Sequence, residues 1–218
     1  MAKKLVNKII IVGCGPGSKK FMTGQATQYI KDADVLVGSR RLLSLFQNSE
    51  AVKYTLNRNY KQLITRIISL SKNKSVVVLV SGDPGFFSYA KLIVDKAGIE
   101  NCVVVPGISS VQLAFARIGR TWNDACFMSL HGRTGRLAEL IRRVREHEKV
   151  AVLTDNSNNV KLIARKLLDE GLKERKIYVC ENLSLNKERI REFDVTSLQR
   201  VQVKGLNVII ILDEESSE

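Results

Sequence analysis

Short runs of β-branched residues recur along the chain between helical patterns, and they constrain the fold more than any other feature of the sequence. Two of them, KIIIVG at residues 8–13 and SVVVLVS at residues 75–81, are apolar at every internal position. A strand with one wet face alternates polar and apolar residues, so these runs indicate strands that are covered on both faces. Such strands, alternating with helices, form a parallel sheet with helices on each side. We therefore predict a parallel α/β domain for the first half of the chain.

The same reasoning gives the predicted elements and a two-domain organisation. In the first half, strands are predicted at residues 8–13, 34–38, 75–81 and 102–107, and helices at residues 22–33, 40–46, 60–72, 86–97 and 109–118. In the second half, strands are predicted at residues 125–130, 149–154, 176–180, 188–193 and 207–212, and helices at residues 134–146 and 158–170. Thr23 is a candidate N-cap and Gly98 a candidate C-cap.

The second sheet is predicted to be mixed, because its fourth strand alternates apolar and charged residues only loosely. A change in composition near residues 121–124 indicates a boundary. We predict an N-terminal α/β domain at residues 1–122, which carries the glycine loops, and a C-terminal α/β domain at residues 123–213. The acidic tail at residues 214–218 is predicted to be disordered.

The chain of 218 residues carries a formal net charge of +13. Such a charge favours anionic partners, namely nucleic acid, a membrane surface or a small molecule rich in carboxylates or phosphates, but a lysine-rich surface without a partner explains it equally well. The densest basic run, RLAELIRRVREHEK at residues 136–149, has apolar residues at helical spacing and three glutamates. The run therefore indicates the solvent-exposed face of an amphipathic helix rather than an RNA-binding patch.

Cysteine and histidine usage argues against a metal site or a disulfide framework. The four cysteines lie far apart without a CxxC pair, and the two histidines stand away from them. We therefore expect no metal, and reduced thiols in a cytoplasmic protein. The apolar stretch at the N-terminus is too short for a signal peptide, and no apolar run is long enough to span a membrane.

Three glycine-bearing loops are predicted to follow strands of the first domain. They are GCGPG at residues 13–17, GDPG at residues 82–85 and PGISS at residues 106–110. In an open parallel sheet, ligands bind beyond the carboxyl ends of the strands, and glycine lets backbone approach a ligand closely. One such loop is usually only a turn, whereas three at one edge indicate a binding site.

The first loop does not match the common nucleotide motifs. A dinucleotide site requires G-x-G-x-x-G and an acid after the next strand, but Ser18 occupies the last glycine position and the next strand ends in Val37-Gly38. Pro16 also removes a backbone donor. A P-loop is excluded because GSKK lacks the G-x-x-x-x-G-K-[ST] frame.

Five stretches together resemble a known family. They are VGCGPGSKKFMTGQA, ADVLVGSRRLL, SGDPGFFSYAKLI, VVPGISSVQLAFARIGRTWNDACFMSLHGR and CENLSLNKERI. From residue 8 to residue 212 the chain is similar to the tetrapyrrole methylases, S-adenosylmethionine-dependent methyltransferases of the class III fold. Within the family it is most like the members that methylate C-5 of cobalt-precorrin-7 in cobalamin biosynthesis.

The resemblance implies two α/β domains, S-adenosyl-L-methionine in a cleft between them, a corrinoid substrate and a homodimer, with neither a membrane nor a nucleic acid as partner. Methyl transfer from a sulfonium needs no metal or covalent intermediate. Aerobic relatives carry an added domain for C-15 methylation and decarboxylation. Because this chain ends at Glu218, we expect a separate protein to perform those reactions.

The resemblance also maps site residues onto this sequence. The cofactor contacts it implies are Pro16, Gly82, Asp83, Phe86, Phe87, Ser109, Ser110, Val111, Leu153 and Thr154. Asp83 is a catalytic candidate as well, with a helix cap as the alternative role. The two serines could instead cap a helix, and the two phenylalanines could instead fill the core.

The substrate carries many carboxylates, for which arginine is well suited. Arg40, Arg41 and Arg133 fall in matched segments near predicted loops and are the substrate-binding candidates. His131 is a candidate base that removes a proton after methylation, because the ordinary pKa of histidine is near 6.5. A structural histidine in SLHGR is the alternative.

Two other functions are open to this sequence. The first is a ribosomal RNA ribose methyltransferase of the same fold, for which the positive charge would be favourable, although SLHGR and residues 122–124 argue against it. The second is a non-enzymatic nucleotide-binding module. Glu181 and Asn182 could line a cleft or belong to an ordinary surface loop.

Overall fold

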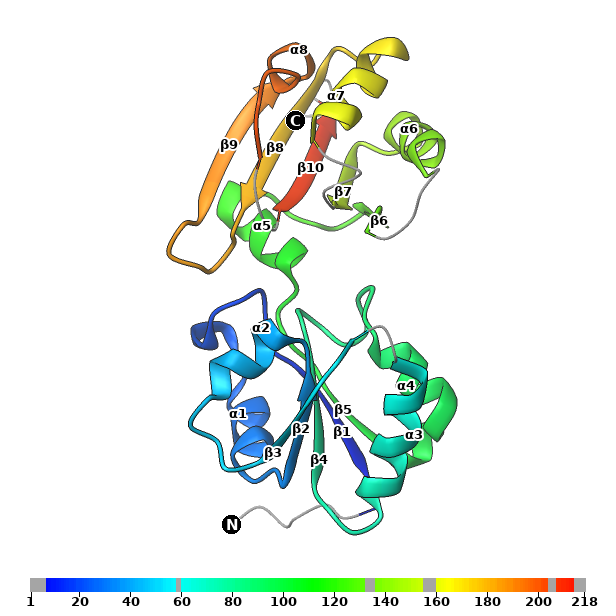
Figure 1. Cartoon of the computed structure of the whole chain (residues 1–218). Helices are drawn as coiled ribbons and strands as arrows, with labels where there is room; N and C mark the ends of the chain where they lie inside the picture. Colours follow the sequence, from blue (N-terminus) through cyan, green and yellow to red (C-terminus); the bar gives the residue numbers. More distant parts are fainter. Residues whose placement is uncertain (1–6, 58–59, 132–135, 155–159, 204–206, 214–218) are drawn as a thin grey trace. The chain divides into compact units, whose positions relative to one another are not determined.

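The computed structural model describes residues 7–57, 60–131, 136–154, 160–203 and 207–213 of the chain (Figure 1). The chain divides between residues 109 and 110 into two compact units. The boundary predicted from the sequence lies instead at residue 122, beyond the other end of helix α5 (Ser110–Ile118). In the structure α5 packs against strand β10 (Asn207–Asp213), so the helix goes with the second unit.

The first unit contains a five-stranded sheet with the order β3-β2-β4-β1-β5, and every neighbouring pair is parallel. The strands are β1 (Ile9–Gly13), β2 (Val35–Gly38), β3 (Val52–Thr55), β4 (Val76–Val80) and β5 (Cys102–Val105). The predicted parallel sheet is confirmed. Strand β3 was not predicted, because this short edge strand is mostly exposed and carries little apolar sequence signal.

Helices cover both faces of this sheet. Helices α1 (Gly24–Lys31) and α2 (Arg40–Leu43), with the 3₁₀ turn η2 (Ser44–Phe46), share one core with Ile10 and Val12 of β1. Helices α3 (Tyr60–Ser71) and α4 (Ala90–Ala97) share the other core with Ile9 and Ile11. Successive side chains of one strand therefore pack in the cores on opposite faces of the sheet, which explains why the strands are apolar throughout. Two further 3₁₀ turns are η1 (Lys19–Phe21) and η3 (Ile99–Asn101).

The predicted helix ends are partly correct. The Thr23 hydroxyl accepts a hydrogen bond of 3.1 Å from the backbone N–H of Ala26 and caps α1, as predicted. Helix α4 ends before Gly98, which has a φ of 85°. Its predicted start at residue 86 is wrong, because a turn from Asp83 and a left-handed residue at Phe87 precede the helix, which begins at Ala90.

The second unit contains a mixed sheet, as predicted, and its strand order is β6-β7-β10-β8-β9. Its other strands are β6 (Cys126–Ser129), β7 (Lys149–Leu153), β8 (Arg175–Glu181) and β9 (Arg189–Asp194). Only β6 and β7 pair in parallel. Helices α6 (Leu137–Glu146), α7 (Val160–Asp169) and α8 (Val195–Leu198) share one core with this sheet. The short helix α8 was not predicted; Asp194 caps it by accepting a hydrogen bond from the N–H of Ser197 at 2.7 Å.

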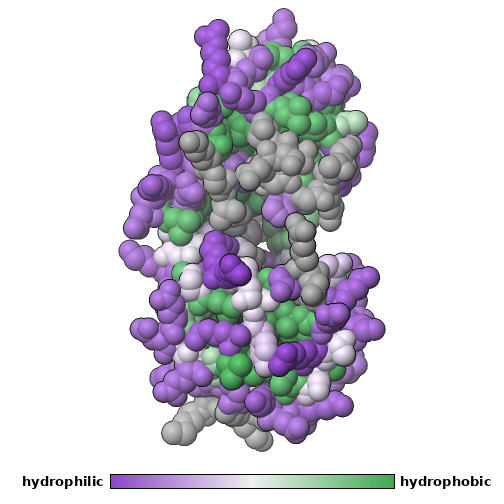
Figure 2. Space-filling model, in the orientation of Figure 1, coloured by the Kyte–Doolittle hydropathy of each residue, from purple (hydrophilic) through white to green (hydrophobic). Residues whose placement is uncertain are grey.

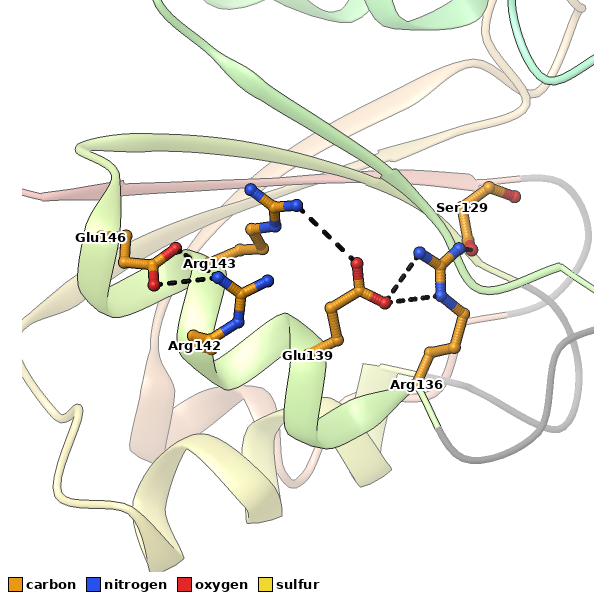
Figure 3. A network of polar contacts seen from close by, with 6 residues as sticks. All are labelled: Ser129, Arg136, Glu139, Arg142, Arg143 and Glu146. Atoms are coloured by element: carbon orange, nitrogen blue, oxygen red, sulfur yellow. Dashed lines mark hydrogen bonds and ion pairs between the residues drawn. The ribbon is translucent and has the colours of Figure 1, made fainter.

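Helix α6 is the amphipathic helix expected from the basic run. Leu140, Ile141 and Val144 are buried. Arg142 and Arg143 of the helix and its N-cap residue Arg136 pair with Glu139 and Glu146 (Figure 3). These pairs compensate part of the local positive charge within the chain itself.

Hydrophilic residues cover most of the visible face of each unit, with smaller apolar patches between them (Figure 2). Among the helices within the described ranges, none is both long and apolar enough to cross a lipid bilayer.

Candidate functional site

The three glycine loops follow β4, β1 and β5, which are neighbours in the first sheet. Because these strands are parallel, their carboxyl ends lie at one edge and the loops meet there. Gly15 and Gly82 exchange two backbone hydrogen bonds of 3.3 and 2.8 Å, and the Cys14 N–H donates to the Val80 carbonyl at 2.9 Å. The predicted convergence of the loops is therefore observed.

Glycine is required where the loops touch. A Cβ on Gly107 would lie 2.5 Å from the carbonyl oxygen of Gly82, and a Cβ on Gly13 would lie 2.7 Å from the backbone nitrogen of Gly107. Both distances are shorter than real Cβ contacts. The three loops thus pack backbone against backbone, more closely than any side chain would allow.

Asp83 ties two of these loops together. Its Oδ1 accepts a hydrogen bond from the Gly85 N–H at 2.7 Å, and its Oδ2 accepts one from the Gly107 N–H at 3.0 Å. The alternative role as a helix cap is wrong, because α4 begins only at Ala90 and has no side-chain cap. The carboxylate instead positions the loop after β4 against the loop after β5.

The connections after β1 and β4 leave this edge in opposite directions. Strand β1 leads to α1 on one face of the sheet, and its neighbour β4 leads to α4 on the other face. Divergent connections from adjacent strands create the crevice where open parallel sheets bind ligands. The glycine loops therefore lie where a ligand is expected.

The other predicted cofactor contacts of the first half have differing exposures. Pro16 is buried and Phe86 is half-buried, whereas Phe87 keeps 46% of its surface exposed. The two rings meet edge to face with centroids 4.8 Å apart, and neither ring belongs to the buried core. Ser109 is buried, and α5 begins at the next residue.

Of the predicted substrate arginines, the structure brings Arg41 to the glycine loops. Its Nη2 donates a hydrogen bond of 2.9 Å to the hydroxyl of Ser81, the residue that directly follows β4. Burial lowers the pKa of Arg41, and the nearby Cys14 raises it in part. No carboxylate pairs with this guanidinium among the residues that the structure describes. Arg40 is exposed, and Arg133 lies outside the described residues.

The second unit also gathers predicted residues at one edge of its sheet. Strands β7 and β8 are both antiparallel to β10, and β6 is parallel to β7, so β6, β7 and β8 end at the same edge. His131, which is exposed, lies just beyond β6. Leu153 and Thr154 lie at the end of β7, and Asn182 follows β8.

Two hydrogen-bonding partners at this edge, Asn207 and Arg191, were not predicted from the sequence. The Thr154 hydroxyl hydrogen-bonds to Asn207 at the start of β10. Glu181 is buried and accepts two hydrogen bonds from Arg191, at 3.0 and 2.7 Å. Glu181 therefore does not belong to an ordinary surface loop. The predicted strands at residues 176–180 and 188–193 could have indicated this pair, because consecutive strands commonly form a hairpin.

Comparison with known proteins places the chain among methyltransferases. The family described as Tetrapyrrole (Corrin/Porphyrin) Methylases matches residues 8–199. The probable cobalt-precorrin-7 C(5)-methyltransferase of Methanocaldococcus jannaschii is 36% identical, over 84% of this chain and 87% of that protein. The cobalt-precorrin-7 C(5)-methyltransferase of Salmonella typhimurium is 34% identical, over 94% of this chain and 99% of that protein.

Two solved structures illustrate the similarity in fold. The precorrin-6Y methylase from Archaeoglobus fulgidus is 26% identical, with a TM-score of 0.70, over 95% of this chain and 98% of that chain. The uroporphyrin-III C-methyl transferase from Thermus thermophilus, solved in complex with S-adenosylhomocysteine, has a TM-score of 0.75 at 22% identity. That match covers 95% of this chain and 97% of that chain. The second likeness establishes the fold alone.

Proposed function

The chain belongs to the tetrapyrrole (corrin/porphyrin) methylase family, and we propose that it transfers a methyl group from S-adenosyl-L-methionine to C-5 of cobalt-precorrin-7 in cobalamin biosynthesis. The observation that carries the proposal is the likeness to two proteins of that name. Each is more than 30% identical, over at least 84% of this chain and most of its own length.

The first unit fits a ligand that is held largely by backbone. Three glycine-bearing loops meet at one edge, and a Cβ at Gly107 or Gly13 would force them apart. The residues proposed to hold the cofactor here are Pro16, Gly82, Asp83, Phe86, Phe87, Ser109, Ser110 and Val111, and those in the second unit are Leu153 and Thr154. When bound, S-adenosylmethionine supplies a methyl group that its sulfonium has already activated.

The residues of the chain then have to position the reactants rather than activate them. Correct orientation of two reactants is worth about 7–11 kcal/mol of the barrier. Asp83 contributes by holding the loop after β4 against the loop after β5. Its carboxylate also places negative charge at an edge proposed to receive a cationic ligand.

Arg41 is the substrate-binding candidate with the strongest structural support. Among the residues that the structure describes, the partly buried Arg41 guanidinium has the neutral Ser81 hydroxyl as its hydrogen-bond partner. It therefore retains donors for a carboxylate, which arginine binds in a bidentate manner. We propose that it binds an acidic side chain of the tetrapyrrole, together with Arg40 and Arg133. His131 remains the proposed base.

The reaction is tested by incubating the protein anaerobically with labelled S-adenosylmethionine and the cobalt-precorrin pool. We expect one labelled methyl group on a tetrapyrrole, detected by mass analysis at C-5. Label in ribosomal RNA with none in the tetrapyrrole would overturn the assignment. The RNA reaction would also be recognised by binding that weakens steeply with salt, because many phosphate contacts release counterions.

We further propose a homodimer in the cytoplasm. Strand β5 is an uncharged edge strand with Val104 43% exposed, whereas the opposite edge strand β3 carries Lys53. An edge without a charged residue favours pairing with another chain. Light scattering of the wild type and of Val104→Lys tests the dimer, which the lysine should weaken.

The cytoplasmic location is supported by the cysteines. Free thiols at all four of them agree with a reducing compartment.

A further inference from the structure

Phe87 is the one bulky residue with left-handed backbone in the part of the chain that the structure describes. Its φ is 47°, and the other non-glycine residues with positive φ are small and polar, namely Asn7, Asp124, Asn182 and Ser184. Asparagine and aspartate tolerate this region, whereas a bulky side chain there is strained. Glycine or asparagine at residue 87 would adopt this left-handed backbone with less conformational strain.

The phenyl ring adds a second unfavourable feature. Phe87 keeps 46% of its surface exposed, so it forgoes nearly half of the stabilisation that full burial of a phenylalanine provides. Strain and exposure at one residue both lower stability, and such features persist mainly where they serve function.

The ring is nevertheless held in place. Before it, the Phe86 N–H donates to the Asp83 carbonyl at 3.1 Å and closes a turn. After it, the Ser88 hydroxyl accepts a hydrogen bond from the Ala90 N–H at 3.0 Å, where α4 begins. Phe86 packs against the ring edge to face. Phe87 therefore extends a fixed aromatic surface from the carboxyl end of β4, beside the glycine loops.

We propose that Phe87 determines substrate binding: its ring contacts the apolar face of the tetrapyrrole, while the half-buried Phe86 keeps the cofactor role. The inference rests on the proposed function and replaces the cofactor role that was given to Phe87 above. A large conjugated macrocycle offers a broad apolar face, and aromatic rings bind such faces by offset or edge-on contact. Phe86, by contrast, is half-buried and has less surface to offer a large ligand.

The test compares Phe87→Gly, Phe87→Ala and Phe87→Trp with the wild type. For the glycine and alanine variants we expect KM for the tetrapyrrole to rise about tenfold, equivalent to about 1.4 kcal/mol. The Kd for S-adenosylhomocysteine, measured by calorimetry, should change less than twofold. Phe87→Trp should retain binding. Phe87→Gly should be at least as stable as the wild type, because it removes the strain. Leu92→Ala on α4 is the matched control, since Leu92 is 44% exposed.

Weaker binding of S-adenosylhomocysteine with an unchanged KM for the tetrapyrrole would assign the ring to the cofactor. Equilibrium binding of the cobalt-precorrin pool, followed by absorbance, separates this inference from the proposed reaction. A wild type that binds tetrapyrrole without transferring methyl would refute only the reaction. Equal tetrapyrrole binding by wild type and Phe87→Gly would refute the role of Phe87, and a wild type that binds none would refute both.

Discussion

Asp83 and Gly107 show how single residues build the edge where the loops meet. One carboxylate accepts two backbone hydrogen bonds from different loops, and one glycine has no space for a methyl group. Neither role depends on a bound ligand, so both can be tested for stability and for binding separately.

We expect Asp83→Ala to weaken S-adenosylhomocysteine binding at least tenfold, or about 1.4 kcal/mol. The loss of two acceptor contacts should also lower the free energy of unfolding by about 1–3 kcal/mol. Calorimetry and urea denaturation measure the two effects. Asp83→Asn should recover part of the stability, because the amide oxygen still accepts one bond. Asp95→Ala is the control, since Asp95 is an exposed partner of Lys91. An unchanged affinity for Asp83→Ala would contradict the assignment.

Gly107→Ala should lower the free energy of unfolding by about 1–3 kcal/mol, because the added Cβ would lie 2.5 Å from the Gly82 carbonyl oxygen. Binding of S-adenosylhomocysteine should weaken as the loops separate. Gly24→Ala in α1 is the matched control, because nothing lies within 4 Å of its Cβ position. That variant should be as stable as the wild type or more so. Equal stability of the two variants would show that the loops have more freedom than the contacts indicate.

Among the secondary-structure elements, the hairpin of β8 and β9 contains a largely buried ion pair. Glu181 is 8% exposed and Arg191 holds it with two hydrogen bonds. A buried charge that loses its partner is strongly destabilising, whereas loss of both partners together costs much less.

Arg191→Ala should therefore lower the free energy of unfolding by about 3–5 kcal/mol, as measured by urea denaturation. The double variant Glu181→Leu with Arg191→Met should recover most of that loss. Lys91→Ala breaks an exposed pair on α4 and should change stability by less than about 1 kcal/mol. If the single and double variants at 181 and 191 were equally stable, the pair would not be the source of the effect.

The molecule as a whole consists of two units, and each contains a buried thiol. Burial raises the pKa of Cys14 in the first unit and of Cys180 in the second unit to about 12, from an ordinary value of 9.0. The unfolded chain loses these protons above pH 9 while the folded chain keeps them. Both thiols therefore stabilise the fold fully below pH 9, and this contribution is lost as the pH rises from 9 toward 12.

We expect the free energy of unfolding to fall by about 1.4 kcal/mol per buried thiol between pH 8 and pH 10. Urea denaturation at the two pH values measures the fall. Cys14→Ala should reduce it for the first unit and Cys180→Ala for the second, whatever each substitution does to stability at pH 8. A fall of the same size in both variants and the wild type would contradict the buried thiols as its source.

Much of the fold could be read from local pattern. Long unalternating runs such as that of β4 indicated a parallel sheet, because strands covered on both faces must be apolar throughout. Strand β3 and helix α8 were not predicted, because an element of four residues shows too little periodicity in its sequence. The start of α4 was placed too early because apolar spacing cannot reveal a left-handed residue at Phe87.

Local chemistry along the chain was sufficient to indicate the fold class, the three glycine loops and the family, since each depends on short segments whose residue types are tightly constrained. The contact of Asp83 with Gly107, the approach of Arg41 to Ser81 and the pairing of Glu181 with Arg191 emerged only from the folded structure. The last two pairs join side chains that lie far apart in the sequence. Each of these side chains could form a hydrogen bond with many other polar groups. The distances that select one partner are set by strand order and register, which come from packing across the entire sheet.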